Sequence, residues 1–457
     1  MEKLTMDKLV SHCKNTGIVY PGSEIYDGLA NTWDYGPVGV ELKNNIKRAW
    51  WKRFVQESEN SYGVDATIMM NPRVWEASGH VSSFTDPKMD CKTCKTRTRA
   101  DNLIENFSKG TIDVDAMTNE EMEKYIADNK VKCPVCGNFN WTPIRQFHLM
   151  FHTSRDITGD ANDIIYLRPE TAQGEFVNFM NVQRTTRAKV PFGIGQIGKA
   201  FRNEITPGNF TFRTIEFEQM EHQLFCKNEE EGFKFYEKYK KDAMQFLLDL
   251  GFNPEHLKYK DHEKLAFYAK AACDIIFEYP FGWNELNGIH YRTDYDLSQH
   301  QKFSGKNMFY IDPVTNEKYI PHDVEYSIGA DRLTLAVLCE FYDEQQLENG
   351  ETRIVYHFHP ALAPYKVAVL PLQKNLSEKA REIYKTLSKH FMCTYDDAGS
   401  IGKRYRRQDQ IGTPYCVTID FETLENGTIT IRDRDSMEQI RLNETELVKY
   451  IQDKIFF

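Results

Sequence analysis

The stretch "FRNEITPGNFTFRTIEFEQME", residues 201–221, decides the fold of this chain. Apolar and charged residues alternate from Phe201 onward, and they alternate again around Phe210 and Phe212. This period of two predicts two β-strands joined by a turn at Pro207-Gly208. One face of the hairpin is then apolar, and the other gathers arginines and carboxylates. Such a face is either a solvated surface with cross-strand ion pairs or a site for a phosphorylated ligand, and the hairpin alone leaves both open.

The composition of the chain excludes several classes of protein. The chain has 457 residues, of which 41% are hydrophobic, so it can bury the cores of two or three domains. It contains no apolar run of about 18 residues, which a membrane-spanning helix needs. Its charged first segment, "MEKLTMDKLVSHCKNTG", lacks the apolar core of a signal peptide, and its ten cysteines are too few for a disulfide scaffold of this length. We therefore expect a cytoplasmic protein that does not enter a membrane.

The net charge argues against a general nucleic-acid coat. The formal net charge is −10, but residues 361–457 are close to neutral, and within them "GKRYRRQDQ" collects four cations around Tyr405. A short basic run of this kind is either a solvated surface or a local patch that contacts phosphates.

Most of the chain reads as a mixture of helices and strands. Helices are predicted over 37–57 and 329–342, where apolar residues recur at helical spacing, and residues 228–279 read as mainly helical. Residues 65–72 read as a strand that Pro72 ends.

A polar, charged segment at 343–353 predicts a linker between two domains. After it, strand and helix patterns alternate to the end of the chain, which is typical of an α/β domain. We therefore expect a first domain over 1–345, with insertions at 88–150 and 225–280, and a second domain over 355–457.

Four cysteines in the first insertion stand in two C-x-x-C pairs, Cys91 with Cys94 and Cys133 with Cys136. Four thiolates at this spacing can hold a tetrahedral structural Zn²⁺. The alternative is a site that holds no metal. If a metal ion binds, its four protein ligands leave no open position for catalysis on the metal.

The segment "GIGQIG", residues 193–198, matches the dinucleotide-binding fingerprint. That fingerprint requires a helix after the glycines, whereas the hairpin strand follows here. The glycines therefore indicate close backbone packing instead.

The segment "PHDVEYSIGADRLTLAV", residues 321–337, predicts a strand followed by a helix. Glu325 and Ser327 alternate on the strand, Gly329 ends it, and Arg332 falls in the first helical turn. A cation there opposes the helix dipole unless an anion binds beside it. Arg332 is thus either an ordinary surface arginine or part of a polyphosphate site.

Together these segments resemble the class II aminoacyl-tRNA synthetases. Residues 201–221 resemble motif 2, "GADRL" resembles motif 3, and residues 37–72 resemble motif 1, the dimer-forming element. Further segments resemble the α2 glycyl-tRNA synthetase family: "PGSEIYDGLANTWDYGPVGVELK", "NPRVWEASGH", "LRPETAQG" and "WNELNGIHYRTDYDL". The segment "IGKRYRRQDQIGTPYCVTID" resembles an anticodon-binding domain. The resemblance covers nearly the whole chain. It implies an α+β fold in which an antiparallel sheet flanked by helices precedes a C-terminal α/β anticodon-binding domain.

The resemblance also implies the chemistry and its residues. Glycine and ATP, with Mg²⁺, would form an adenylate, from which glycine passes to tRNA-Gly. Arg202 and Arg332 are the implied catalytic residues. Arg202 would hold the α-phosphate, Glu204 would read the adenine amino group, Phe217 would stack on adenine, and Glu285 is the candidate Mg²⁺ contact. The implied ATP site comprises Arg202, Asn203, Glu204, Phe212, Arg213, Phe217, Glu285, Leu286, Gly329, Ala330, Asp331 and Arg332.

Two more sets of residues follow from the resemblance. Glycine offers an ammonium but no side chain, so carboxylates must hold it and close packing must exclude a methyl group. The implied amino-acid pocket comprises Arg99, Glu170, Phe217, Glu218, Gln219, Met220, Glu221, Arg292, Glu325, Ser327 and Gly329. The implied tRNA contacts are Lys403, Arg404, Arg406 and Arg407, and the implied assembly is a homodimer through residues 37–72.

Three rival hypotheses stay open from the sequence. The chain could be another class II synthetase, although those lack "TWDYGP" combined with "RPETAQG". It could be a non-catalytic relative, although such relatives usually lose the motif 2 or motif 3 arginine. It could be an acyl-adenylate ligase that does not use tRNA, against which the anticodon-like domain counts.

Overall fold

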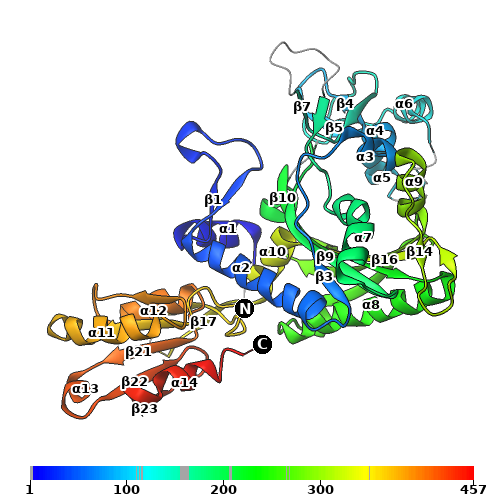
Figure 1. Ribbon diagram of the computed structural model, residues 1–457. Coiled ribbons are helices and arrows are strands. Elements are labelled where there is room, and N and C mark those ends of the chain that lie inside the picture. The colour runs from blue at the N-terminus through cyan, green and yellow to red at the C-terminus, as the bar shows by residue number, and fades with distance from the viewer. Residues whose placement is uncertain are drawn as a thin grey trace.

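A seven-stranded sheet forms the centre of the computed structural model (Figure 1). The structure describes residues 4–456 apart from 110, 113, 115–116, 155–163, 205–207, 264, 267 and 349. Neighbouring strands of this sheet run antiparallel, except that β3 is parallel to β9. In sheet order the strands are β11 (Leu257–Asp261), β12 (Ala271–Tyr279), β13 (Gly282–Thr293), β16 (His322–Gly329), β10 (Glu216–Cys226), β9 (Phe192–Phe201) and β3 (Ser61–Gly63).

The two faces of this sheet have different cover. On one face, apolar side chains such as Met220 and Tyr326 pack in one core with the helices α2 (Pro37–Trp51), α8 (Glu229–Asp249) and α10 (Ala330–Glu340). On the other face, α7 (Ala172–Thr186) packs Phe176 and Phe179 against Phe225. Because α7 covers only part of its face, polar residues further along the same strands can line a cavity. The antiparallel sheet with flanking helices confirms the expected fold class.

The motif 2 hairpin differs from its prediction in its second half. Strand β9 ends at Phe201, and the return strand starts only at Glu216, since residues Phe210–Phe212 form a 3₁₀ turn. The reason is a contact with a distant segment: Asn203 donates its N–H to the Leu149 carbonyl instead of to the hairpin partner. The predicted turn at Pro207 and the position of Ile205 lie outside the described residues.

Two further predictions of secondary structure are wrong. Residues 65–72 contain only a single bridge, Met69 to Leu167, and Pro72 starts the helix α3 (Pro72–Ala77) instead of ending a strand. The region 225–280 is not mainly helical, because after α8 it supplies β11 and β12 to the central sheet. Strand β12 is buried on both faces, so its sequence is a continuous apolar run. The periodicity of such a run does not show whether it forms a strand or a helix.

The glycines of "GIGQIG" lie inside β9, where they allow close packing, as expected. A Cβ on Gly193 would lie 2.2 Å from the His222 ring, and one on Gly198 would lie 2.2 Å from the Arg168 guanidinium. These glycines therefore serve the sheet and its contacts, and not a dinucleotide.

Smaller elements surround the sheet. The insertion at the top of Figure 1 holds β4 (Thr85–Asp90), β5 (Arg97–Arg99), α5 (Ala100–Ser108), α6 (Asn119–Asp128) and β6 (Arg145–His148) around its own apolar cluster. The remaining elements of the first domain are α1 (Met6–Asn15), β1 (Val19–Pro21), β2 (Trp33–Tyr35), α4 (His80–Ser83), β7 (His152–Ser154), β8 (Ile164–Tyr166), α9 (Tyr295–Ser304), β14 (Tyr310–Ile311) and β15 (Lys318–Tyr319).

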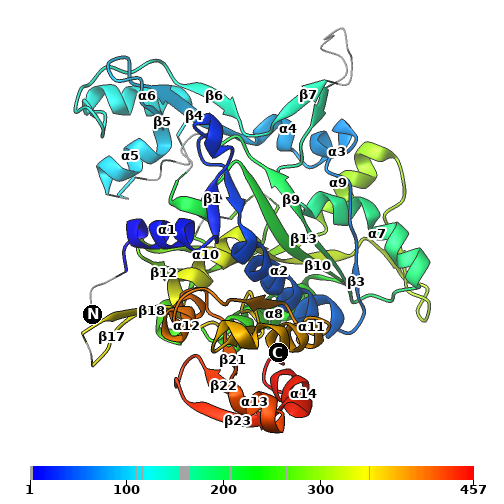
Figure 2. The same cartoon turned by 90° about the vertical axis from the view of Figure 1, so that its left-hand side faces the viewer.

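The predicted linker at 343–353 is not a free linker, because it forms most of the hairpin β17 (Tyr342–Gln346) and β18 (Thr352–Tyr356). This hairpin packs against the C-terminal domain, seen below the central sheet in Figure 2. That domain has its own five-stranded sheet with helices, which agrees with the expected α/β domain. Its elements are β19 (Val367–Pro371), α11 (Ser377–Leu387), β20 (Cys393–Tyr395), α12 (Ile401–Gln410), β21 (Tyr415–Ile419), α13 (Phe421–Asn426), β22 (Thr428–Asp433), β23 (Gln439–Asn443) and α14 (Leu447–Gln452). Within the described residues, no helix has the length and apolar character to cross a membrane.

Candidate active site

A polar cavity lies on the central sheet beyond the part that α7 covers. Strand alternation selects its lining, since every second residue of β10, β13 and β16 points into it. The predicted residues that the structure brings together there are Glu170, Arg202, Glu204, Phe212, Arg213, Phe217, Gln219, Glu221, Glu285, Leu286, Arg292, Glu325, Ser327, Gly329, Asp331 and Arg332.

One end of the cavity carries arginines and aromatic rings. The Arg202 guanidinium lies 5.3 Å from the centre of the Phe217 ring, and its Nε donates to the Pro169 carbonyl at 2.9 Å. Across the cavity, the Arg332 guanidinium lies 4.6 Å from the Phe212 ring centre. The two ring contacts and the hydrogen bond of Arg202 hold both guanidiniums in position. Their terminal N–H groups remain to bind a ligand.

Carboxylates accompany the arginines at this end. Arg332 forms an ion pair with Glu285, with 2.7 Å between Nη1 and Oε1, and this guanidinium lowers the pKa of Glu285. Glu204 lies 3.9 Å from Arg213. Cations, carboxylates and ring faces in one place can bind a polyphosphate, a divalent cation and a heterocyclic base.

The other end of the cavity gathers carboxylates. Glu221 accepts hydrogen bonds from Ser327 at 2.8 Å, from Gln219 at 2.9 Å, and from Thr171. All three donors are neutral. Burial, together with the nearby carboxylates of Glu325 and Glu170, raises the pKa of Glu221 to about 7. A buried carboxylate without a cationic partner is suited to bind a ligand cation.

The other two carboxylates of this end already have cationic or polar partners. Glu325 accepts from His290 at 2.8 Å and from Arg292 at 3.2 Å, and Arg292 also forms a two-bond pair with Asp296. Although burial disfavours its charge, Glu325 has a lowered pKa because of Arg292 and His290. Glu170 lies 3.3 Å from His80.

The structure leaves five predicted site residues outside the cavity lining, all within the described chain. Glu218 and Met220 point to the opposite face of β10, because their neighbours point in. Ala330 is buried in the core, and Asn203 is tied to Leu149. Arg99 forms ion pairs with Asp86 and Asp101 in the insertion.

Several residues that build the site were not predicted from the sequence. Gly288 and His290 lie between Leu286 and Arg292 on β13, so the period of two would have selected them. Thr171 follows Glu170 directly in "RPETAQG". Tyr268 stacks on Arg292, with 4.2 Å between the guanidinium and the ring centre, and no pattern in the sequence indicates this contact.

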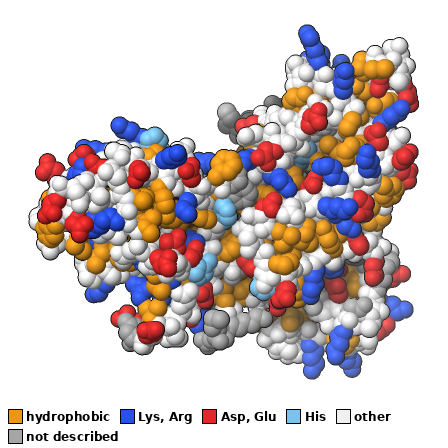
Figure 3. Space-filling model, turned by 90° about the horizontal axis from the view of Figure 1, so that it is seen from below, with side chains coloured by type: hydrophobic (Ala, Val, Ile, Leu, Met, Phe, Trp, Pro, Cys, Tyr) orange, Lys and Arg blue, Asp and Glu red, His pale blue; other side chains and the backbone are white. Residues whose placement is uncertain are grey.

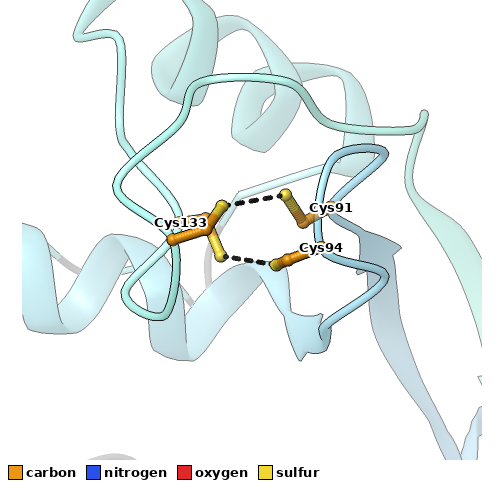
Figure 4. Close-up of side chains that lie close together, drawn as sticks. Cys91, Cys94 and Cys133 are labelled. Carbon is orange, nitrogen blue, oxygen red and sulfur yellow. Dashed lines mark hydrogen bonds between the residues drawn. The ribbon is translucent and has the colours of Figure 1, made fainter.

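The four predicted metal ligands converge in the insertion (Figure 4). The sulfur atoms lie within 4.8 Å of one another, with 3.7 Å between Cys91 and Cys136 and 3.7 Å between Cys94 and Cys133. A tetrahedral ion with bonds of about 2.3 Å to sulfur needs sulfur atoms about 3.8 Å apart. The chemistry and spacing of these thiols therefore fit Zn²⁺.

The basic run of the C-terminal domain lies on α12. One of its four cations, Arg404, is buried and not on the surface, so its predicted tRNA contact is wrong. Arg404 is 2% exposed, and its guanidinium donates to the carbonyls of Pro371, Leu372 and Asp396. Arg406 and Arg407 remain partly exposed, and Arg407 pairs with Asp396. Figure 3, which shows the molecule from below, shows basic and acidic side chains intermingled on that face.

Comparison with known proteins supplies the family. Residues 366–454 match the model of an anticodon binding domain. The chain is 58% identical to the glycine–tRNA ligase of Clostridium acetobutylicum and 59% identical to that of Clostridium kluyveri, in each case over 99% of both chains. It is 58% identical to the glycine–tRNA ligase of Geobacillus thermodenitrificans over 99% of this chain and 98% of the relative. The sheet, the two-ended cavity and these similarities agree with the motifs: the chain belongs to the glycine–tRNA ligase family of class II aminoacyl-tRNA synthetases.

Proposed function

We propose that this chain attaches glycine to tRNA-Gly in two steps, both in the cavity on the central sheet. In the first step, the glycine carboxylate attacks the α-phosphorus of ATP, a phosphorus–oxygen bond forms, and pyrophosphate leaves. In the second step, a ribose hydroxyl of the tRNA attacks the carbonyl of glycyl adenylate, and AMP leaves. The observation that carries this proposal is that one cavity is lined by a group of arginines, Arg202, Arg213 and Arg332, and by a group of carboxylates, Glu170, Glu221 and Glu325.

The arginine end fits the roles that the family resemblance gives its residues. Arg202 holds the α-phosphate and stabilises the charge that develops there, while adenine stacks between Phe217 and Arg332. Glu204 reads the adenine amino group, and Arg213 approaches the terminal phosphates. Glu285 is the candidate Mg²⁺ contact, and its carboxylate offers the oxygen ligands that Mg²⁺ prefers. Mg²⁺ would neutralise charge on the departing pyrophosphate.

The carboxylate end fits the glycine ammonium. Glu221 is the main counter-charge, because its present donors are neutral, and Glu170 and Glu325 add to the negative potential. Arg292 keeps Glu325 in place through a buried ion pair. Alanine would be excluded by overpacking of its methyl group, which costs about 1–3 kcal/mol.

We also propose the domain assignment and the compartment. Residues 1–345 form the catalytic domain, with insertions at 88–150 and 225–280, and residues 355–457 form the anticodon-binding domain. The match to an anticodon binding domain at 366–454 supports the second assignment. We place the reaction in the cytoplasm.

Arg202→Ala tests the function directly. We expect wild-type protein to exchange pyrophosphate into ATP with glycine and with none of the other nineteen amino acids. In Arg202→Ala the exchange rate should fall by about a hundredfold or more, because the variant loses a cation at the reacting phosphate. Arg187→Ala, an exposed arginine at the end of α7, is the control and should keep full exchange. Normal exchange in Arg202→Ala would reject the assignment.

The pKa of Glu221 predicts how glycine use depends on pH. The ionised form binds the ammonium, and the pKa is raised to about 7, so the KM for glycine should fall as pH rises from 6 to 8. Exchange measured across this range in wild type and Glu221→Gln checks this. The variant should have a higher KM for glycine with a flatter pH profile. An unchanged profile in the variant would show that another group, such as His290, titrates instead.

The four cysteines of the insertion bind a structural zinc ion. Protein purified without chelator should contain about one zinc ion per chain by elemental analysis. Cys94→Ser should lose it, whereas Cys339→Ser, outside the cluster, should keep it. Zinc-free wild-type protein would contradict the proposal.

The chain forms a homodimer through residues 37–72, as motif 1 implies. Trp50 cannot supply interface area, because it is fully buried within its own chain, whereas Val40 on α2 is 40% exposed. Light scattering at micromolar protein should give twice the mass of the chain, and Val40→Lys should shift the mass toward that of a monomer. A monomer mass for the wild type would reject this assembly.

The exposed cations of α12 contact the anticodon arm of the tRNA. Replacing Lys403, Arg406 and Arg407 with alanine should raise the KM for tRNA about tenfold and flatten its salt dependence, because phosphate contacts release counterions. Glycine-dependent exchange needs no tRNA and should stay near wild type. Lys385→Ala, on the exposed surface of α11, is the control. An equal fall in exchange and aminoacylation would show that the run is structural.

A further inference from the structure

We propose that Lys43 on α2 is a positioning residue for adenylate formation, which it reaches through Asp331 in the first turn of α10. The inference rests on the proposed function, since it concerns the ATP end of the same cavity. Lys43 itself lies outside the cavity lining, on the far side of β10.

Lys43 forms a buried ion triad with two carboxylates. Its Nζ lies 2.7 Å from Asp331 Oδ1 and 3.1 Å from Glu218 Oε2, and the three side chains are 7%, 8% and 14% exposed. Nζ also lies 4.6 Å from the centre of the Tyr35 ring. Burial opposes the charge of the ammonium, but the two carboxylates outweigh it and raise the pKa of Lys43. Lys43 is therefore the cation that the two carboxylates share.

Asp331 connects this cluster to the sheet. Its second oxygen, Oδ2, accepts the backbone N–H of Glu218 at 2.7 Å. Strand β16 ends at Gly329, which pairs with Gln219, so the ladder between the two strands stops one residue before Glu218. The Asp331 carboxylate takes the place of the next strand residue. It thereby fixes the start of β10 against the start of α10.

The residues next to Glu218 and Asp331 in the sequence are the two that we assign to the two faces of adenine. Phe217 precedes Glu218, Arg332 follows Asp331, and both line the cavity. The distance between the aromatic ring and the guanidinium therefore depends on the contact between Asp331 and the Glu218 backbone. Lys43 maintains that contact, because without its ammonium two buried carboxylates would repel each other.

Lys47 is a matched control one turn along the same helix. Its Nζ lies 3.0 Å from Glu218 Oε1, but the described structure gives it no contact with Asp331, and its side chain is 23% exposed. Removing its charge weakens the support of Glu218 and leaves the bond between Asp331 and the backbone in place. A general effect of charge on α2 would appear in both variants, whereas positioning through Asp331 would appear only at Lys43.

The test is glycine-dependent pyrophosphate exchange with full-length variants. In Lys43→Met we expect the KM for ATP to rise and kcat to fall, so that kcat/KM for ATP drops about tenfold to a hundredfold, while the KM for glycine stays near wild type. Lys47→Met should stay close to wild type, and Lys43→Arg, which retains the charge, should recover part of the loss. Light scattering and thermal melting establish that the variants compared are folded and have the wild-type mass.

A double variant keeps the proposal falsifiable if Lys43→Met does not fold. Lys43→Met with Asp331→Asn removes the unpaired charge but keeps an oxygen for the Glu218 N–H, so it should fold and recover ATP use relative to Lys43→Met. Wild-type kinetics in a folded Lys43→Met, an equal loss in Lys47→Met, or a loss confined to glycine would each overturn the proposal. A wild-type protein without glycine-dependent exchange would instead overturn the proposed function.

Discussion

The pairing of β10 with β16 fixes both the core and the cavity. Their register places Glu221 opposite Ser327 and Gln223 opposite Glu325, while β13 places His290 on the other side of Glu325. Since side chains alternate between the two faces, a slip of one residue would move these polar groups into the apolar core, where Met220 now lies. The burial of the core side chains and the assembly of the polar site are thus two consequences of one register.

The proposed function explains why the two ends of the cavity carry opposite charges. A polyphosphate is an anion, so arginines meet it, and stacking on Phe212 and Phe217 holds those arginines before the ligand arrives. An amino acid presents an ammonium, so carboxylates must be buried to meet it. Burying them is unfavourable unless hydrogen bonds compensate, and the donors around Glu221 and the ion pair of Glu325 with Arg292 supply that compensation.

The sequence allowed the fold class and most of the cavity to be predicted, because both depend on local periodicity and on motifs that resemble a known family. Its failures share a physical cause, namely contacts between distant segments. Asn203 leaves the hairpin for the Leu149 carbonyl, and the apolar run at 271–279 becomes a strand because neighbouring strands pair with it. Arg404 has the residue type of a phosphate contact, but the carbonyls of another strand surround it. The identity of a residue does not predict which distant segment it will contact.

The C-terminal domain shows why a buried ion cluster can matter for a surface function. Asp409, at the end of α12, is fully buried and binds both Arg353 of the hairpin β17–β18 and Arg432 of β22, at 2.8 Å and 2.9 Å. The inner face of the helix is thereby tied to the segment that leads back to the catalytic domain. Exposed cations on the outer face of α12 then keep a defined position relative to the cavity. In the proposed function one tRNA contacts both of these surfaces, so a fixed separation between them would reduce the entropy lost when both ends of the tRNA bind. Breaking Asp409 from Arg353 would leave each surface chemically intact and still weaken their cooperation.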